Sequence, residues 1–292
     1  MAAPRVLLVD ASPYIFRAHF ALPSSMVDRQ GRPVNAVYGF ASFLLKLMAE
    51  EGPSHVGIAF DRSLTTSFRN ELYPDYKGQR ELPPPDLEDQ LDDCLLLTEA
   101  MGTAAFVDER YEADDLVATL CARIAPTAAT VVTSDKDLAQ LVDERVDWLD
   151  FARGERYDAA EVEVRLGIEP ARIPDLLGLA GDSVDNIPGV RGIGPKTALA
   201  LLAHFPSVEA VCEGVEEIAT LPLRGAARLA KLVGDQAEQA ILSKELATVV
   251  RSAPVHARLA DLELSRPDTS RLDPLCERLG FEALRQRILE RH

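Results

Sequence analysis

Three short apolar runs in the first half of the chain each end in an aspartate: Arg5–Asp10, His55–Asp61 and Thr130–Asp135. Continuously apolar runs of this length are typical of strands buried on both faces of a parallel sheet. Helical periodicity between them, clearest over residues 37–50 and 116–121, predicts an α/β fold with a largely parallel central sheet flanked by helices. The carboxyl ends of parallel strands share one edge, where such folds bind ligands, so we expect the three aspartates to face one cleft.

Six further acids lie close to these runs or in a later turn. Those at positions 112–115 open a helix, and because acids in a first helical turn complement the helix dipole, that group alone favours a structural role. If all nine carboxylates lie at one edge of the sheet, however, they cannot stay ionised together without cations to balance their charge. All-oxygen ligands select magnesium or manganese, and we expect two such ions. The nine candidate ligands are Asp10, Asp61, Glu112, Asp114, Asp115, Asp135, Asp137, Asp182 and Asp185.

A glycine-rich stretch, Gly181–Thr197, joins acids to a candidate phosphate-binding loop. The spacing of Asp182 and Asp185 predicts two carboxylates on one side of a helical turn. Three glycines then permit a tight turn whose N–H groups could converge on an anion, and Pro195 predicts the first position of a helix that also presents Lys196. This pattern favours a helix-hairpin-helix that grips a nucleic-acid backbone. A glycine-rich loop between two helices is the open alternative.

Residues 66–93, here called the arch segment, are different in kind. Cations and aromatics interleave there without a clear apolar stripe, as in Tyr76-Lys77-Gly78-Gln79-Arg80. A polar insertion after a site-bearing strand is typical of a functional loop or lid, and the alternative is a solvated linker. Arg17 lies close to Asp10 in sequence and is either a site residue or a surface cation.

The net charge of −16 argues on its face against a polyanionic partner. Two divalent ions would reduce it to −12, and local cations would then supply a modest, salt-sensitive grip on a nucleic acid. The candidates are Arg17, Lys77, Arg80, Arg191 and Lys196. The four cysteines are isolated in sequence, which gives no support to a disulfide or zinc site. No apolar run is long enough to span a membrane and no signal peptide is evident, so we expect a cytoplasmic protein.

Five motifs occur in the order found in the 5′-nuclease family, which the chain resembles from Val6 to its end: Leu-Leu-Val-Asp-Ala-Ser, Tyr-Lys-Gly-Gln-Arg, Glu-Ala-Asp-Asp, Ser-Asp-Lys-Asp and Gly-Asp-Ser-Val-Asp-Asn-Ile-Pro-Gly-Val. This family comprises the flap endonucleases and the 5′→3′ exonuclease domain of bacterial DNA polymerase I. The resemblance implies a PIN-like core with two metal sites. It assigns Asp10, Asp61, Glu112 and Asp114 to the first site, and Asp114, Asp135, Asp137, Asp182 and Asp185 to the second, with Asp115 nearby.

The resemblance also implies roles for the cations. Lys77 and Arg80 match the family's helical arch and Arg17 matches an arginine near the scissile phosphate, which makes these three the candidate catalytic residues. Tyr76, beside Lys77, is a candidate DNA-binding residue. The glycine hairpin matches the element that holds the downstream duplex, with Gly189, Arg191, Gly192, Gly194, Lys196 and Thr197 as its DNA-binding residues. In several family members this hairpin also binds a potassium ion, so K⁺ is a further candidate.

We therefore expect a catalytic domain over residues 1–178 and a helical DNA-binding region over 179–292, with the helix-hairpin-helix at about 182–202. The expected activity is that of a Mg²⁺- or Mn²⁺-dependent 5′→3′ exonuclease and flap endonuclease on DNA with 5′ flaps, 5′ overhangs or nicks. The alternatives are a PIN-type ribonuclease and a DNA-binding module without activity. We expect a monomer working beside a DNA polymerase and a ligase. No polymerase region follows, so the chain is either free-standing or an excised domain.

Overall fold

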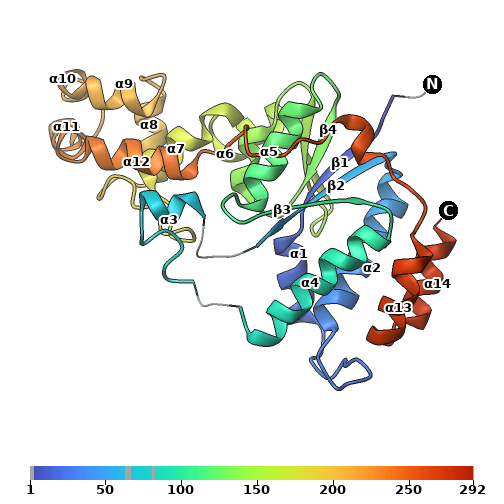
Figure 1. Cartoon of the computed structure of the whole chain (residues 1–292). Coiled ribbons are helices and arrows are strands. Elements are labelled where there is room, and N and C mark those ends of the chain that lie inside the picture. The colour runs from blue at the N-terminus through green and yellow to red at the C-terminus, as the bar shows by residue number, and fades with distance from the viewer. Residues whose placement is uncertain (1–2, 63–66, 81–82, 292) are drawn as a thin grey trace.

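A computed structural model describes residues 3–62, 67–80 and 83–291. Its centre is a six-stranded sheet in the order β3-β2-β1-β4-β5-β6 (Figure 1). The first five strands in this order run parallel, and β6 pairs antiparallel with β5. Their bounds are Val6–Asp10 (β1), His55–Asp61 (β2), Ala104–Asp108 (β3), Ala129–Val132 (β4), Val146–Asp150 (β5) and Glu155–Tyr157 (β6). The α/β class with a largely parallel sheet is confirmed.

Helices cover both faces of the sheet. Consecutive residues of a strand point to opposite faces, and in the central strands both sets are apolar. One face packs against α1 (Ser12–Ala21), α2 (Asn35–Glu51) and α4 (Pro85–Ala100), with Val9 and Ile58 among the strand residues buried there. The other face packs against α5 (Ala113–Arg123) and the extended segment 249–262, with Leu8 and Val131 among its buried residues. The central strands are therefore fixed in a three-layer sandwich, and their carboxyl ends are fixed with them.

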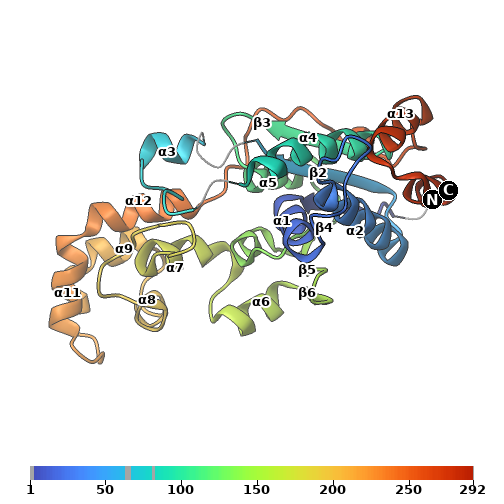
Figure 2. The same cartoon turned by 90° about the horizontal axis from the view of Figure 1, so that it is seen from below.

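A second, helical part of the chain has its own core beside the carboxyl edge of the sheet (Figure 2). It comprises α6 (Ala159–Leu166), α7 (Ile173–Ala180), α8 (Pro195–Leu202), α9 (Val208–Glu213), α10 (Val215–Ile218), α11 (Ala226–Asp235) and α12 (Ala237–Ala247). The remaining elements are α3 (Phe68–Leu72), α13 (Thr269–Leu279), α14 (Glu282–Glu290) and the 3₁₀ turns η1 (Lys136–Leu141), η2 (Pro170–Arg172) and η3 (Leu259–Leu262). Among the described residues, we find no helix with the length and apolar character needed to cross a bilayer.

Several expectations about local structure were confirmed, including both early strands and Pro195 as the first residue of a helix. Two were wrong. Residues 85–93 belong to α4 and bury Leu87 against the core, and residues 68–72 form α3, so the arch segment is not a continuous polar loop. Residues 66, 81 and 82 lie outside the described residues. Asp182 and Asp185 lie in a tight turn closed by hydrogen bonds between the backbones of Asp182 and Ile187, at 2.8 and 2.9 Å, and not in a helix.

The C-terminal segment also departs from the expected division of the chain. Helices α13 and α14 pack on α2 and α4, where Leu272 and Ile288 are buried in the same core as β1 and β2. Figure 1 places them at the end of the molecule opposite α9 to α11. Residues 249–290 thus return from the helical part to the sheet.

Gly189 tests how tightly the glycine turn is built. Its φ is +59°, and an added Cβ would lie 2.3 Å from the backbone nitrogen of Gly181. We expect Gly189→Ala to lower the free energy of unfolding by about 1–3 kcal/mol from the backbone conformation alone, with the clash adding to this. Gly194→Ala is the matched control, because nothing lies within 4 Å of a Cβ there. Urea unfolding of both variants measures the difference, and equal stabilities would contradict the packing described here.

Candidate active site

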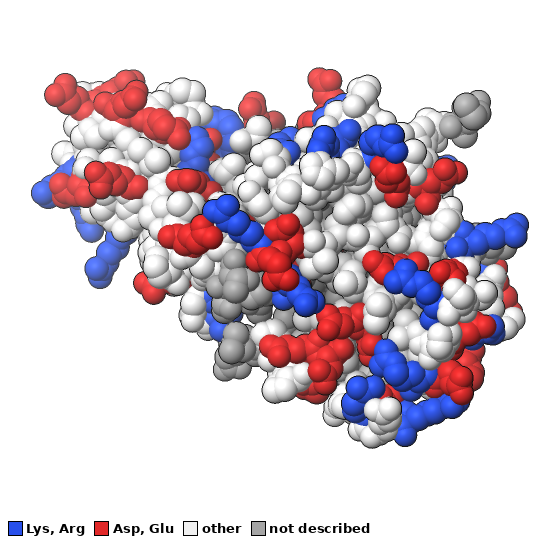
Figure 3. Space-filling model, in the orientation of Figure 1, with Lys and Arg blue, Asp and Glu red and all other residues white. Residues whose placement is uncertain are grey.

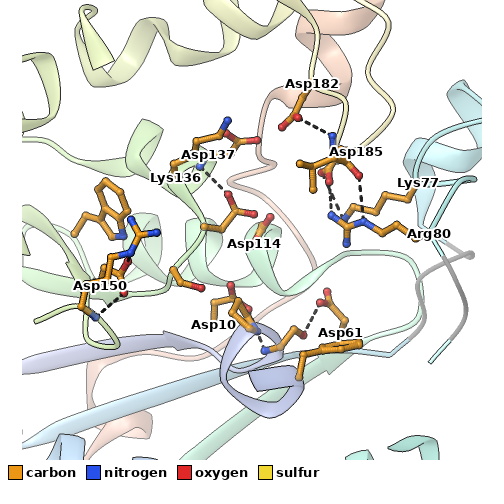
Figure 4. A pocket seen from close by; sticks show the side chains of 18 of the residues that line it. Asp10, Asp61, Lys77, Arg80, Asp114, Lys136, Asp137, Asp150, Asp182 and Asp185 are labelled. Carbon is orange, nitrogen blue, oxygen red and sulfur yellow. Dashed lines mark hydrogen bonds and ion pairs between the residues drawn. The ribbon is translucent and has the colours of Figure 1, made fainter. Parts of the chain in front are cut away.

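Carboxylates from the strand ends converge on one open pocket of about 480 Å³, here called the acid pocket. Figure 4 shows Asp10 and Asp61 at the bottom of it, Asp182 and Asp185 at the top, Asp114 between them and Asp137 at the upper left. Seven of the nine predicted acids line it, namely Asp10, Asp61, Asp114, Asp135, Asp137, Asp182 and Asp185. The cleft expected at the carboxyl edge of the sheet is therefore present.

The two acids at the ends of β1 and β2 are held by short hydrogen bonds. Asp10 accepts hydrogen bonds from the Thr133 hydroxyl at 2.8 Å and from the Ser12 N–H at 3.3 Å. Asp61 accepts from the Ser12 hydroxyl at 2.6 Å and from the first N–H of α5, that of Ala113, at 2.8 Å. The sheet edge and a helix N-terminus thus orient both carboxylates.

Three more acids, Asp114, Asp135 and Asp137, line the pocket, and the pKa values of the acids there are perturbed. Burial, and then the charge of Asp61, raise the pKa of Asp10 to about 8, while burial and Asp135 raise the pKa of Asp137 to about 8. Burial also raises the pKa values of Asp114 and Asp135. These carboxylates resist ionising together, as expected for like charges in a desolvated site.

Two cations of the arch segment, Lys77 and Arg80, reach into the pocket beside Asp185 (Figure 4). Lys77 Nζ lies 2.7 Å from Glu112 and 3.8 Å from Asp185, and Arg80 pairs with Asp185. Tyr76 is only 3% exposed, and its hydroxyl donates to Glu112 at 3.1 Å and lies 3.2 Å from Asp185. Tyr76 therefore supports the acids from within the protein, and its ring is not available to stack on a DNA base.

The remaining two predicted acids lie beside the pocket and do not line it. Glu112 and Asp115 are both buried and share the guanidinium of Arg69 at 2.8–3.0 Å. Burial opposes the charge of Glu112, but Lys77 and Arg69 outweigh it and hold the pKa of that carboxyl below its usual value. Both carboxylate oxygens of Asp115 accept hydrogen bonds from Arg69, so the structure does not bring this acid to the expected metal site.

Sequence reasoning missed the wall of the pocket formed by residues 148–166. Asp150, Arg153 and Arg165 line the acid pocket there, together with Trp148. The Arg165 guanidinium lies over the rings of Trp148 and Tyr157, with its carbon 5.8 and 4.7 Å from their centroids. Asp150 ends β5, but Asp147 interrupts the apolar run there, so the rule used for the other strands did not find it.

Two predicted site residues do not lie where their expected roles require. Arg17 is exposed on α1 and lines a separate cavity between α1 and α2, so it is not beside the acids. Gly189 is buried, and its N–H donates to the Ser243 hydroxyl at 3.0 Å, which removes it from a phosphate-binding role.

In the hairpin itself, the N–H groups of Arg191 and Thr197 also donate to protein acceptors, Gln236 and Gly194. Arg191, Gly192 and Gly194 are exposed in the turn before α8, and Lys196 is exposed in the first turn of α8. Acidic and basic side chains lie intermixed over the face of the molecule in Figure 3.

The ligand chemistry of the acid pocket fits a hard divalent cation, because its donors are carboxylate oxygens whose charges repel one another. Across residues 3–62, 67–80 and 83–291, no three acidic, histidine or cysteine side chains lie close enough together to hold an ion as they stand. Lys77 and Arg80 partly neutralise the acids in this arrangement. Binding an ion would therefore require side-chain movement within the pocket.

The comparisons with known proteins define the class. Residues 5–167 match the model of the 5′-3′ exonuclease N-terminal resolvase-like domain, and residues 168–270 match that of the 5′-3′ exonuclease C-terminal SAM fold. The chain belongs to the 5′-3′ exonuclease family, a family of nucleases, and the resemblance inferred from its motifs is confirmed.

Among its relatives is DNA polymerase I of Bacillus caldotenax, which is 39% identical over 290 residues. That match covers 97% of this chain and 32% of the polymerase, so the chain spans about a third of that relative's length. Bacteriophage T5 5′-exonuclease, solved with divalent zinc ions, has the same fold at 19% identity, with a TM-score of 0.67 over 98% of this chain and 97% of its own. The T5 flap endonuclease solved with DNA and metal ions gives a TM-score of 0.66 at 20% identity, covering 98% of each chain.

Asp137 provides a test of the burial and repulsion that raise the pKa values of acids in the acid pocket. Its folded-state pKa is raised from 3.8 to about 8, so in chelator the parent should lose stability as the pH rises from about 4 to 8, while Asp137→Asn should not lose this contribution. We expect the variant to melt at a higher temperature than the parent, by a margin that grows with pH. Glu213→Gln, an exposed acid on α9, is the control. A parent and variant with parallel pH profiles would refute the raised pKa of Asp137.

Proposed function

We propose that this chain is a divalent-metal-dependent, structure-specific 5′→3′ exonuclease and 5′-flap endonuclease acting on DNA. The observation that carries the proposal is the acid pocket itself, where strand-end carboxylates face Lys77 and Arg80 across a space open to solvent. The exposed hairpin at residues 191–196 follows the Asp182–Asp185 turn directly, which supports a duplex held next to the site of cleavage. Family membership supports the reaction class.

Two Mg²⁺ or Mn²⁺ ions are part of this proposal. Asp10, Asp61 and Asp114 would hold one ion, with Glu112 close by, and Asp135, Asp137, Asp182 and Asp185 would contribute to the second. Such a pair of ions lowers the pKa of water and neutralises charge on a departing oxygen at phosphorus. The metal ions bound by the T5 enzymes support this assignment. A potassium ion at the hairpin carbonyls is a secondary part of the proposal.

The chain's own cations would act on the phosphate. In the absence of DNA, Lys77 and Arg80 are paired with Glu112 and Asp185. A scissile phosphate entering the pocket would compete for both, because it presents anionic oxygens to the same side chains. Arg153 and Arg165 line the opposite wall, so cations flank the phosphate on two sides. Their positive charge would favour the more highly charged transition state.

The wider setting follows from the same proposal. Residues 1–178 would form the catalytic unit and the helical region after it the DNA-binding unit, with the helix-hairpin-helix at 182–202; the packing of residues 249–290 on the sheet favours adding them to the catalytic unit. The substrates would be DNA with 5′ flaps, 5′ overhangs or nicks, acted on by a monomer in the cytoplasm beside a polymerase and a ligase. A ribonuclease or a silent DNA-binding module would each fail the cleavage assay below.

Cleavage of labelled substrates tests the reaction class. A 5′-flap DNA should be cut near its junction in Mg²⁺ to leave 5′-phosphate and 3′-hydroxyl ends, and EDTA should abolish the cut. Blunt duplex and single-stranded RNA of the same sequence are the controls and should be cut far more slowly. Products with 3′-phosphate ends, undiminished cutting in chelator, or a preference for RNA would each exclude the proposed function.

Asp185→Asn and Lys196→Ala should separate catalysis from duplex binding. Asp185 lies in the acid pocket and Lys196 on the exposed hairpin. The first variant should bind a flap in Ca²⁺ as well as the parent but cleave it orders of magnitude more slowly at saturation. The second should bind more weakly, with a salt slope shallower by roughly one unit, and recover its rate at saturating substrate. Fluorescence anisotropy across a salt series and single-turnover rates measure both.

Normal cleavage by Asp185→Asn would remove that carboxylate from the reaction. An unchanged affinity and salt slope for Lys196→Ala would remove the hairpin from the DNA-binding surface. Lys231→Ala, which changes an exposed lysine on α11 paired with Asp235, is a control for the loss of one positive charge.

A further inference from the structure

Arg69, in the first turn of α3, is a buried arginine that the proposed chemistry does not use. It is 2% exposed, yet all five of its N–H donors have acceptors. Nε donates to the Leu246 carbonyl at 2.8 Å, and Nη2 donates to the Thr248 carbonyl at 3.1 Å and to Asp115 at 2.8 Å. Nη1 donates to Asp115 at 2.8 Å and to Glu112 at 3.0 Å. Because all five donors form hydrogen bonds, the guanidinium restrains the positions of Glu112, Asp115 and the two backbone carbonyls.

These contacts join three separate parts of the chain. Arg69 itself belongs to the arch segment, Glu112 and Asp115 open α5, and the two carbonyls lie at the end of α12. Asp115 in addition accepts from the N–H of Val250 at 2.8 Å. The Arg69 guanidinium lies between the acids at the N-terminus of α5 and the carbonyls at the C-terminus of α12. Its positive charge is favourable with both groups. Removing it would leave two carboxylates buried with one cation fewer.

Glu112 connects Arg69 to the acid pocket. Its Oε2 atom accepts from Arg69 at 3.0 Å, and its Oε1 atom accepts from Lys77 Nζ at 2.7 Å. Lys77 lines the acid pocket and is 8% exposed, so Glu112 is the contact that aims its amine. If Glu112 shifted, Lys77 would lose its closest partner. The geometry of the arch cation therefore depends on a residue that does not touch the pocket.

We infer that Arg69 is a positioning residue for the nuclease reaction, acting through Glu112 to hold Lys77 toward the scissile phosphate. Asp115 belongs to this device as the bidentate partner of Arg69, which accounts for its distance from the metal-binding acids. The inference rests on the proposed function for its effect on rate. Its structural part, the dependence of Lys77 on Arg69, stands independently.

Arg69→Lys is the central variant, because it keeps the charge but cannot reproduce the five-donor fork. Asp115→Asn is the second, which keeps the oxygen acceptor and removes the charge; it serves if the first does not fold. Arg110→Ala is the matched control. It also removes an arginine that pairs with an acid, but the ion pair is exposed; its partner Glu71 lies on α3, as Arg69 does. Thermal unfolding of each variant establishes that rates are compared on folded protein.

Single-turnover cleavage of a 5′-flap DNA in Mg²⁺ measures the effect on the reaction. Arg69→Lys should lower the saturated rate about tenfold or more while the flap Kd in Ca²⁺ changes by less than about threefold. In a Lys77→Ala background the same change should cost less than about twofold, because the residue through which Arg69 acts is gone. Full additivity of the two substitutions, or a parental rate for the folded Arg69 variant, would overturn the inference.

Trypsin digestion without DNA or metal tests the structural part separately from nuclease activity. Cleavage after the buried Lys77, identified by mass spectrometry, should be faster in Arg69→Lys and Asp115→Asn than in the parent and in Arg110→Ala. Equal rates in all four proteins would overturn the inference whatever the cleavage assay gives. If trypsin cuts the two variants faster but the parent does not cleave flap DNA, the proposed function alone is refuted and the dependence of Lys77 on Arg69 stands.

Discussion

Carboxylates brought together at the carboxyl edge of a buried sheet repel one another, and the arrangement of the site follows from this. The strands place Asp10 and Asp61 side by side because β1 and β2 are adjacent and parallel. Burial raises the pKa values of Asp10, Asp114, Asp135 and Asp137, and more acids than cations line the pocket. The pocket therefore lacks positive charge. Lys77 and Arg80 of the arch segment supply part of it. The same deficit makes the pocket suited to divalent cations and to the phosphate that they would accompany.

The sequence could predict the edge of the sheet because its signal is local. An apolar run ending in aspartate specifies a buried strand and the position of its acid, which succeeded at Asp10 and Asp61. Asp150 was missed because Asp147 interrupts the apolar run of β5. Pro195 similarly marks a helix start, since its fixed φ and missing N–H suit that position. The family was recognisable for the same reason, as its motifs lie in these strand ends and turns.

Tertiary contacts were not predictable in this way. Nothing in the spacing of Glu112 and Asp115 reveals that Arg69, more than forty positions earlier, takes up one oxygen of the first and both of the second. Arg17 is seven positions from Asp10, yet it lies on the face of α1 turned toward α2, because helical rotation separates it from the pocket. The exposed or buried state of Tyr76 likewise depends on how the arch segment folds back onto the turn that contains Asp185.

Anomalous diffraction from crystals grown with Mn²⁺ and without DNA would show directly whether the acid pocket binds metal. We expect anomalous peaks within the acid pocket, coordinated by carboxylates among Asp10, Asp61, Asp114, Asp135, Asp137, Asp182 and Asp185, with Arg80 displaced from Asp185. Glu112 should remain on Arg69, since that pair is complete without an ion. Peaks absent from the pocket at saturating Mn²⁺, with Lys77 and Arg80 still on their acids, would contradict the claim that the pocket is built to bind metal.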